Sequence, residues 1–159
     1  CTVELVGVDA NPRTVGHARA HLEARLRPSL RDRVRVETGD ALSLDWADAS
    51  VDVVHAALVL HHFHGPAAVA LLAEMNRVAR LGIVVNDLHR HIFAYIGIWA
   101  LSRALGLARM VQHDAPLSVR RGFLREDLHA LARRASLPSP SIRWHWAFRW
   151  TLSTLSAPA

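Results

Sequence analysis

Short apolar runs alternate with helical patterns through the first half of the chain. The runs are TVELVGVD at 2–9, DRVRVETGD at 32–40, ASVDVVHAAL at 49–58 and GIVVND at 82–87. The last is nearly all apolar up to its polar end, as in strands that are covered on both faces. Strands that alternate with helices predict an α/β fold, with a mostly parallel sheet and helices on both faces.

The helices of this pattern have recognisable start signals. Asn11 and Pro12 supply an N-cap and a first-turn proline for a helix that runs to about Leu26. Pro66 opens a second helix, PAAVALLAEMNRVAR, whose apolar positions share one face. For the less regular second half we expect a helix over 90–110, a loop or short helix over 113–122, an amphipathic helix over 124–137 and one or two closing strands over 141–155.

Composition indicates one globular domain of 159 residues, with 51% apolar and 21% charged residues. All nineteen basic residues are arginines spread along the chain, so the formal charge of +5 indicates solvated surface, and we expect no nucleic-acid binding. Cys1 is the only cysteine, which allows no internal disulfide and favours a cytoplasmic setting. The longest apolar stretch, 92–102, is about half the length that crosses a bilayer, so we expect no stable membrane insertion.

Three predicted strands end in a carboxylate, at Asp9, Asp40 and Asp87. In an open parallel sheet, ligands bind beyond the carboxyl ends of the strands, so these side chains are expected at one rim. Asp9 has two acceptor oxygens for the hydroxyls of a ribose; the alternative is that it helps cap the following helix. Gly39 lets the chain pass close to a flat ligand, and Asp40 can accept an adenine amine; the alternative is an ordinary turn. The spacing of Asp9 and Asp40, with a helix between them, favours one adenosine site.

Several segments together resemble a known family. VELVGVDANPRTVGHAR, DRVRVETGDALSLDWADASVDVVHAALVLHHF and LLAEMNRVARLGIVVNDLHR are similar, in unbroken order over residues 3 to 90, to class I S-adenosylmethionine-dependent methyltransferases of the small-molecule type. RRGFLREDLHALARRASL resembles the penultimate helix of that family. The resemblance implies a Rossmann-like methyltransferase fold, S-adenosyl-L-methionine as cofactor, and methyl transfer to oxygen or carbon of a hydrophobic, aromatic or polyketide- or lipid-like small molecule.

Positions in the cofactor site are carried over from the resemblance. It implies that Asp9 holds the ribose hydroxyls, and that Asp40 receives the adenine amine. The neighbouring cofactor-binding positions are Ala10, Asn11 and Gly39, with Ala41 at the ring and with Ala57 and Leu58 near the methionine part.

The chain departs from the family at its beginning. The first strand and the Gly-rich loop of the G-x-G-x-G kind are absent, so residue 1 corresponds to a point about 35 residues into such a domain. We therefore expect a single methyltransferase domain over 1–159 that is incomplete at its N-terminus. Either the chain is a fragment or the protein is degenerate, and the fragment alone is expected to be weak or inactive in cofactor binding.

The segment LVLHHFHG at 58–65 supplies candidate bases. Imidazole titrates near neutrality, so His62, or after it His61, can take a proton from a phenol or enol as it attacks the methyl group. The alternatives are that one histidine caps the helix at Pro66 and that another packs under the sheet. Neighbouring histidines point in different directions and no tight ligand spacing is present, so we expect no metal site.

The acceptor site is expected after the fourth strand. Asp87 and His89 are candidate substrate-binding residues, with helix capping as the alternative for Asp87. His113, beside Asp114, is a third candidate, and a satisfied pair within a loop is its alternative. Residues 90–122 are expected to form a helical insertion that covers the acceptor. Its apolar helix over 92–102 is interpreted as a lid or as core packing, with Phe93 and Gly97 on one face and Tyr95 and Trp99 on another.

Two other functions compete with methyl transfer. A nicotinamide-dependent oxidoreductase also has an acid after its second strand, but the short-chain type needs a Tyr-x-x-x-Lys pair, and this chain has one tyrosine, Tyr95, and no lysine. The other is a non-catalytic binding protein on a degenerate methyltransferase fold. Oligomeric state is left open by the sequence.

Overall fold

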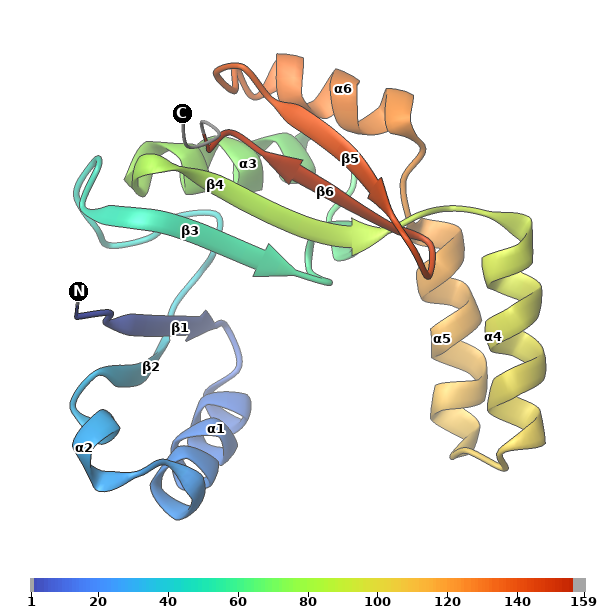
Figure 1. Ribbon diagram of the computed structural model, residues 1–159, viewed down its shortest axis with the longest axis horizontal. Helices are drawn as coiled ribbons and strands as arrows, with labels where there is room; N and C mark the ends of the chain where they lie inside the picture. Colours follow the sequence, from blue (N-terminus) through green and yellow to red (C-terminus); the bar gives the residue numbers. More distant parts are fainter. Residues whose placement is uncertain (1, 156–159) are drawn as a thin grey trace. The chain divides into compact units, whose positions relative to one another are not determined.

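The computed structural model describes residues 2–155 and divides the chain into two compact units, Cys1–Trp46 and Ala47–Ala159. Cys1, on which the prediction about disulfides depends, lies outside the described residues. Figure 1 shows the elements of each unit. The expectation of a single incomplete domain stays a prediction.

The first unit is a two-stranded parallel sheet with helices. β1 (Leu5–Asp9) pairs with β2 (Val34–Thr38), and α1 (Pro12–Arg25) and the short α2 (Pro28–Arg31) lie between them in sequence. Asn11 caps α1 as predicted: its side chain accepts a hydrogen bond from the Arg13 backbone N–H at 2.9 Å. Parallel pairing aligns Asp9 with Thr38, so both strands end at the same edge.

The second unit contains a four-stranded sheet in the order β3-β4-β6-β5. Its elements are β3 (Val51–Ala57), the 3-10 helix η1 (Leu60–His62), α3 (Pro66–Val78), β4 (Ala79–Leu88), α4 (Ile92–Ala104), α5 (Arg109–Arg121), α6 (Arg125–Arg134), β5 (Ser141–His145) and β6 (Arg149–Ser153). The strands predicted at 49–58 and 82–87, the helices at Pro66 and 124–137, and the two closing strands are all confirmed.

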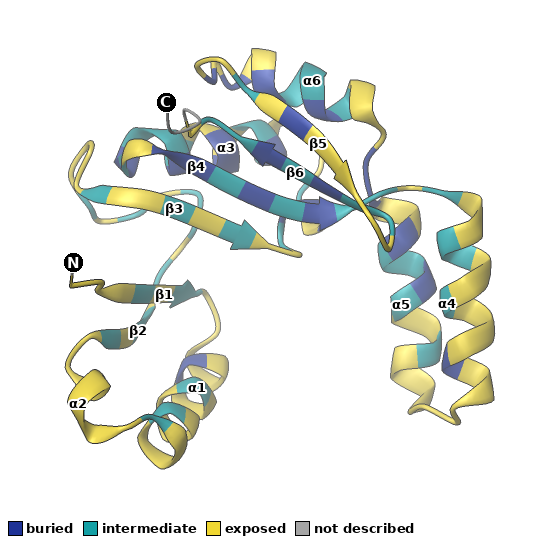
Figure 2. Ribbon diagram, viewed as in Figure 1, coloured by how far each residue is buried: buried dark blue, intermediate teal, exposed yellow. Residues whose placement is uncertain are grey.

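The core of this unit lies between the sheet and two helices (Figure 2). Ile83 and Val85 of β4 alternate with less buried neighbours, so one face of the strand carries the core. The buried partners are Leu71, Leu72 and Met75 of α3, Leu128 of α6 and Leu152 of β6. Burial on one face explains why α3 is amphipathic.

The α/β methyltransferase-like fold is as expected, but the expectation of a mostly parallel sheet is wrong. β3 and β4 are parallel, but β6 is antiparallel to both β4 and β5. The closing strands are joined by the short turn 146–148, and a turn of that length can join only antiparallel neighbours. α3 and α6 contact each other, so the helices that pack along this sheet cover the same face.

The expectations for residues 90–122 are corrected in two places. The segment 113–122, predicted as a loop or short helix, is helical through Arg121 as part of the longer helix α5, which contains Pro116, and α4 ends at Ala104. Core packing, one of the two interpretations of the apolar helix, is wrong, because Ile92 is 61% and Ile96 50% exposed; the lid stays a prediction. No helix among residues 2–155 is long and apolar enough to cross a membrane.

Candidate functional site

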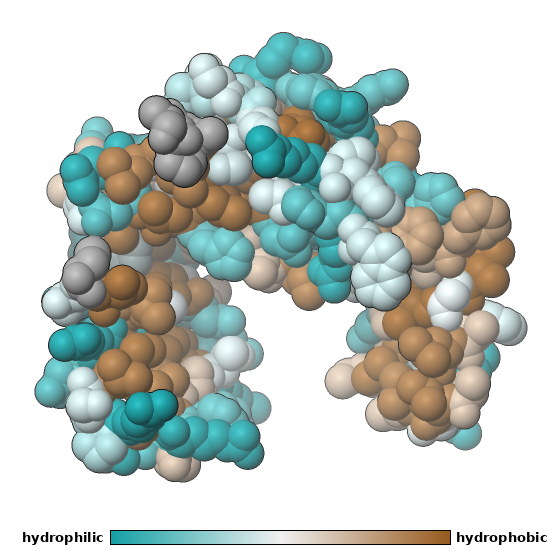
Figure 3. Space-filling model, in the orientation of Figure 1, coloured by the Kyte–Doolittle hydropathy of each residue, from teal (hydrophilic) through white to brown (hydrophobic). Residues whose placement is uncertain are grey.

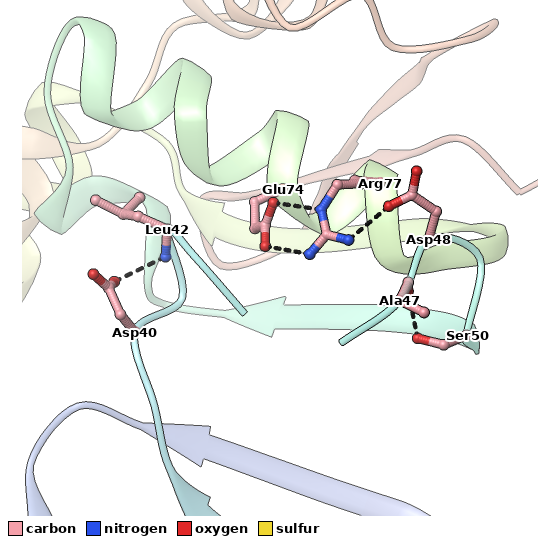
Figure 4. Close-up of polar contacts among 7 residues, drawn as sticks. All are labelled: Asp40, Leu42, Ala47, Asp48, Ser50, Glu74 and Arg77. Carbon is pink, nitrogen blue, oxygen red and sulfur yellow. Dashed lines mark hydrogen bonds and ion pairs between the residues drawn. The ribbon is translucent and has the colours of Figure 1, made fainter. Parts of the chain in front are cut away.

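The first unit brings two predicted acids to the same strand edge. Asp9 ends β1, and the Gly39 N–H donates to the Asp9 carbonyl at 3.1 Å, so Asp40 follows directly beside it. Asp9 Oδ1 accepts the Asn11 N–H at 2.7 Å, and Asp40 Oδ1 accepts the Leu42 N–H at 2.9 Å (Figure 4). Among the described residues the second oxygen of each carboxylate has no partner. Each acid therefore fixes its own loop and keeps one acceptor oxygen for a ligand.

Gly39 has a packing reason to be glycine. A Cβ at this position would lie 3.0 Å from Val8 Cγ1, which is tighter than ordinary contact. The chain passes this closely because it leaves β2 beside the last residues of β1. The small residue thus brings Asp40 to the strand edge, whatever ligand approaches there.

The chain leaves β3 in a strained conformation in the second unit. Leu58 has a φ of 57°, and its N–H donates to the Asn86 carbonyl at 2.8 Å. A left-handed conformation costs a residue with a side chain about 1–2 kcal/mol. Such strain is commonly held where a loop must aim particular side chains, and here the next element is η1 with its two histidines.

His61 is buried and paired with Asp87. The two side chains are 3% and 1% exposed, and His61 Nδ1 lies 2.8 Å from Asp87 Oδ1. Asp87 Oδ2 also accepts the His61 backbone N–H at 3.1 Å. Because the carboxylate accepts at Nδ1, the neutral ring carries its proton there and leaves Nε2 as an acceptor.

Nε2 of His61 is open to a cavity. This nitrogen has no hydrogen-bond partner among the described residues. Every fully buried side-chain nitrogen or oxygen among them does have a partner, so Nε2 is not fully buried. His61 and its neighbour His62, with ring centroids 4.2 Å apart, both line a cavity of about 670 Å³. Burial and the nearby His61 lower the pKa of His62, which favours its neutral form.

His89 lines the same cavity in the opposite hydrogen-bonding state. The indole Nε1–H of Trp144 donates to His89 Nδ1 at 3.3 Å, so the ring proton lies on Nε2. Burial, and then the charge of His91, lowers the pKa of His89, which favours its neutral form. The cavity is therefore lined by an imidazole acceptor, His61, and an imidazole donor, His89.

The rest of the cavity wall is mostly apolar. It is formed by η1, the end of β4, helices α4 and α5 and the β5–β6 turn. Its apolar residues include Leu58, Phe93, Ile98, Leu101, Val119 and Phe148. Phe93 and Gly97 line this cavity, whereas Tyr95 and Trp99 line a separate groove, which confirms the two predicted faces of α4. A cavity of this size and character suits a small aromatic or aliphatic molecule.

Other predicted acceptor residues have different surroundings. Asp87 is not among the cavity-lining residues, because its carboxylate is buried against His61 and the Leu88 N–H. His113 pairs with Asp114 at 3.0 Å on exposed surface of α5, and lines the groove with Tyr95 and Trp99. Ala57 and Leu58 end β3, where Leu58 lines the cavity.

Sequence reasoning missed the β5–β6 turn. Ala147 and Phe148 have positive φ values of 63° and 57° and line the cavity. The Phe148 ring stacks on His91 with centroids 5.0 Å apart, and its carbonyl accepts the His89 N–H at 2.9 Å. Arg149 follows in the cavity wall. The available signal was the alternation WHWAFRW, which predicts strands but not a turn at a ligand site.

An arginine ties the segment before β3 to α3 (Figure 4). Arg77 donates to both oxygens of Glu74, at 2.9 and 2.7 Å, and to Asp48 at 2.7 Å. These hydrogen bonds raise the pKa of Arg77. In the turn before β3, the Ser50 hydroxyl donates a hydrogen bond to the Ala47 carbonyl at 2.6 Å. The contacts hold the start of β3 and so fix where the strand delivers η1.

Metal binding finds no geometric support in residues 2–155. There, no group of three or more His, Cys, Asp or Glu side chains is placed to hold an ion. HHFH and HRH, the two histidine clusters of the sequence, instead divide between the cavity wall, the cap of α4 and exposed surface.

Comparison with known proteins identifies the family. Residues 1–82 match the family model described as methyltransferase domain. The chain belongs to this methyltransferase family. The match covers half of the chain and confirms the resemblance seen in the sequence, including the segments that carry Asp9, Asp40 and the paired histidines.

Solved structures share the fold of this methyltransferase domain. The SAM-dependent methyltransferase from Aquifex aeolicus aligns over 94% of this chain and 67% of its own, with 12% identity and a TM-score of 0.63. A putative O-methyltransferase from Nostoc punctiforme aligns over 94% and 44%, with 13% identity and a TM-score of 0.66. Magnesium protoporphyrin IX methyltransferase from Synechocystis, with bound SAH, aligns over 94% and 63%, with 15% identity and a TM-score of 0.60.

The chain spans only part of these structures, from 67% of the Aquifex aeolicus protein to 44% of the Nostoc punctiforme protein. No curated protein matches the sequence. At identities this low, the structural matches show an α/β methyltransferase fold and do not indicate the acceptor.

Proposed function

We propose that the protein transfers the methyl group of S-adenosyl-L-methionine to a hydroxyl oxygen of a hydrophobic small molecule. The observation that carries this proposal is the 670 Å³ apolar cavity with His61 in its wall, held from behind by Asp87, in a chain of the methyltransferase family. Structures such as PigF and the Synechocystis enzyme contain SAH, which supports this cofactor class. The acceptor is aromatic or polyketide- or lipid-like.

The donor set of the first unit fits the adenosine part of this cofactor. Asp9 keeps one free carboxylate oxygen besides the one that holds Asn11, and so can accept ribose hydroxyls. Asp40 keeps an oxygen for the adenine amine, with Ala10 and Ala41 beside them in the loops. Ala57 and Leu58 are the proposed neighbours of the methionine part. When bound, the cofactor supplies an electrophilic methyl group on a sulfonium.

The cavity histidines determine what the acceptor must present. His61 Nε2 accepts a proton, while His89 Nε2–H donates, so an acceptor with a hydroxyl near a second oxygen satisfies both. The hydroxyl proton passes to His61 Nε2, and Asp87 stabilises the resulting imidazolium. Removal of this proton by His61 would leave the acceptor oxygen as the nucleophile for the methyl group that the bound cofactor would supply. Arg149 lies in the wall as a cation for the anionic oxygen.

Cofactor binding is tested with the full-length protein by isothermal titration of S-adenosylmethionine and S-adenosylhomocysteine. Asp9→Asn keeps an acceptor for the Asn11 N–H but removes the charge, so we expect binding to weaken about tenfold or more, as for a lost charged hydrogen bond. Asp32→Asn, an exposed acid at the end of α2, is the matched control and should bind as the parent does. Undetectable binding by the parent would overturn the proposal.

Methyl transfer is tested with labelled S-adenosylmethionine and a panel of hydroxynaphthoic acids and simple phenols. We expect turnover of acceptors that carry a hydroxyl beside a second oxygen, and we expect His61→Gln to lower kcat about 10²–10⁴-fold, as for loss of a general base. His64→Gln, an exposed histidine two residues beyond His62, is the control. Tight cofactor binding without transfer to any acceptor would instead favour the non-catalytic alternative.

A further inference from the structure

The α4–α5 hairpin carries an unusual amount of exposed apolar surface. Of the nineteen large hydrophobic side chains exposed among the described residues, nine fall within the twenty residues 92–111. Figure 3 shows hydrophobic residues gathered over the free end of this hairpin, away from the sheet. A soluble surface rarely concentrates such residues without a partner.

One set of exposed residues of α4 forms a stripe. Ile92, Ile96, Trp99 and Arg103 follow at intervals of four, three and four residues, so they share a face of the helix. The stripe continues at the end of the hairpin with Leu105, 64% exposed, and Met110, 71% exposed. The Arg103 guanidinium lies 4.3 Å from the Trp99 ring and marks the polar border of the stripe.

A basic groove runs beside this stripe. It has a volume of about 420 Å³ between α4 and α5, and three arginines line it: Arg103, Arg109 and Arg120. None of the three has a carboxylate partner among residues 2–155, whereas Arg90 at the base of the hairpin is paired with Asp127 at 2.8 Å. Residues 88–121 contain a single acid, Asp114, which is paired with His113 at 3.0 Å.

We propose that the α4–α5 hairpin docks on the surface of an anionic lipid bilayer, with its apolar stripe and tip at the acyl boundary and headgroup phosphates in the arginine groove. Apolar residues with an interfacial tryptophan next to unpaired arginines are the pattern of membrane-surface helices. α4 has thirteen residues, a length of about 20 Å, so it lies in the interface and does not span the hydrocarbon core of about 30 Å. The proposal does not depend on the proposed methyl transfer.

Charge argues against a second copy of the chain as the occupant. Two such hairpins would place Arg103, Arg109 and Arg120 against the same arginines, and the single acid of 88–121, Asp114, is already paired with His113 at 3.0 Å. An anionic headgroup layer provides the missing negative charge. Cation–phosphate pairing and apolar burial then act on the same surface.

Vesicle sedimentation with the full-length protein tests the proposal. We expect binding to phosphatidylcholine vesicles that contain about 30% phosphatidylglycerol, little binding to pure phosphatidylcholine, and loss of binding as salt screens the charges. Each basic residue at such a surface contributes about fivefold in partitioning, so Arg109→Gln with Arg120→Gln should weaken binding about 30-fold. Arg143→Gln, an exposed arginine on β5, is the charge control.

The apolar part has its own variants. Leu105→Asp with Met110→Asp should abolish binding, whereas Leu81→Asp, at a 55% exposed leucine of β4, should not, and circular dichroism checks that each variant folds. In a Cys1→Ser background, an environment-sensitive dye on Met110→Cys should shift to shorter wavelength with anionic vesicles. Equal binding to both vesicle types, or binding unaffected by either pair of variants, would overturn the proposal. A dimer in sedimentation velocity that the Leu105 and Met110 variants dissociate would also overturn it.

Discussion

At the scale of single residues, the decisive feature is the carboxylate of Asp87. It accepts from both the ring and the backbone of His61, at 2.8 and 3.1 Å, inside the core of the second unit. The two neighbouring histidines therefore differ in their surroundings: His61 is buried and hydrogen-bonded to Asp87, while His62 is largely exposed. Asp87 is therefore proposed as a positioning residue for His61, in place of the contact with the acceptor that the sequence suggested.

Asp87→Asn tests this role. The amide has one acceptor oxygen, so its NH₂ group must face either the His61 backbone N–H or the ring nitrogen Nδ1. In the second case Nδ1 becomes an acceptor, Nε2 carries the proton, and the base is lost. We expect kcat to fall about tenfold or more, with little change in KM for S-adenosylmethionine, and stability to fall by about 1–3 kcal/mol.

The control for Asp87→Asn is Asp52→Asn, which removes an exposed acid paired with Arg80 at 2.6 Å. Exposed ion pairs contribute little, so this variant should keep both activity and stability. A merely structural role for Asp87 would lower stability while leaving the pH profile of kcat unchanged. That result would contradict the assignment of His61 as the base.

At the scale of elements, the hairpin is fixed to the sheet by backbone contacts around Gly122. The Phe123 N–H donates to the Leu88 carbonyl at 2.9 Å, and the Arg90 N–H donates to the Phe123 carbonyl at 3.1 Å. A Cβ at Gly122 would lie only 2.7 Å from the Leu88 carbonyl oxygen. The end of α5 thus passes against the end of β4 with no room for a side chain, which positions both helices beside the cavity.

Gly122→Ala is expected to lower the free energy of unfolding by about 1–3 kcal/mol, because backbone atoms must move to admit the methyl group. Gly97→Ala is the matched control: it lies in α4 with no atom within 4 Å of its added Cβ. Alanine favours helix over glycine by about 1 kcal/mol, so the control should be neutral or stabilising. Urea unfolding measures both; equal effects would contradict the close approach.

At the scale of the whole molecule, histidine makes stability depend on pH. The formal charge is +5 with neutral histidines, and eleven histidines take up protons as the pH falls. Added positive charge opposes compactness by self-repulsion. Burial lowers the pKa values of His62 and His89 below 6.5 in the folded state. For His62, the positive charges of His61, Arg121 and His64 lower the pKa further, and Asp87 opposes them. For His89, the charge of His91 adds to the effect of burial.

The sign of the effect follows from proton uptake. Between the lowered pKa values and 6.5 the unfolded chain binds more protons than the folded one, so stability is complete above 6.5 and falls as the pH drops. We expect a lower denaturation midpoint at pH of about 5.5 than at about 7.5, and a shallower dependence in the His62→Gln, His89→Gln variant. Added salt should restore only the stability that is lost to repulsion between positive charges. A variant with the parent's pH dependence would contradict the assignment to these histidines.

The sequence by itself determined most of the elements, the family and the placement of two acids at adjacent strand ends. Asn11 and Pro12 start α1, and Asp9 and Asp40 end adjacent strands, as predicted, because caps and apolar periodicity act over a few residues of chain. Local patterns did not reveal that α5 continues through 113–121, since Pro116 is accommodated inside a helix that packs against α4.

Only the tertiary structure decided what the polar residues contact. Asp87 and His61 are 26 residues apart, and their pairing depends on where β4 ends relative to η1, a register that no local pattern encodes. The direction of the closing strands, the cavity formed with the β5–β6 turn, and the exposure of the apolar helix α4 likewise depend on non-local packing. Hydrophobic pattern fixes which residues seek burial, whereas the arrangement of elements fixes which of them achieve it.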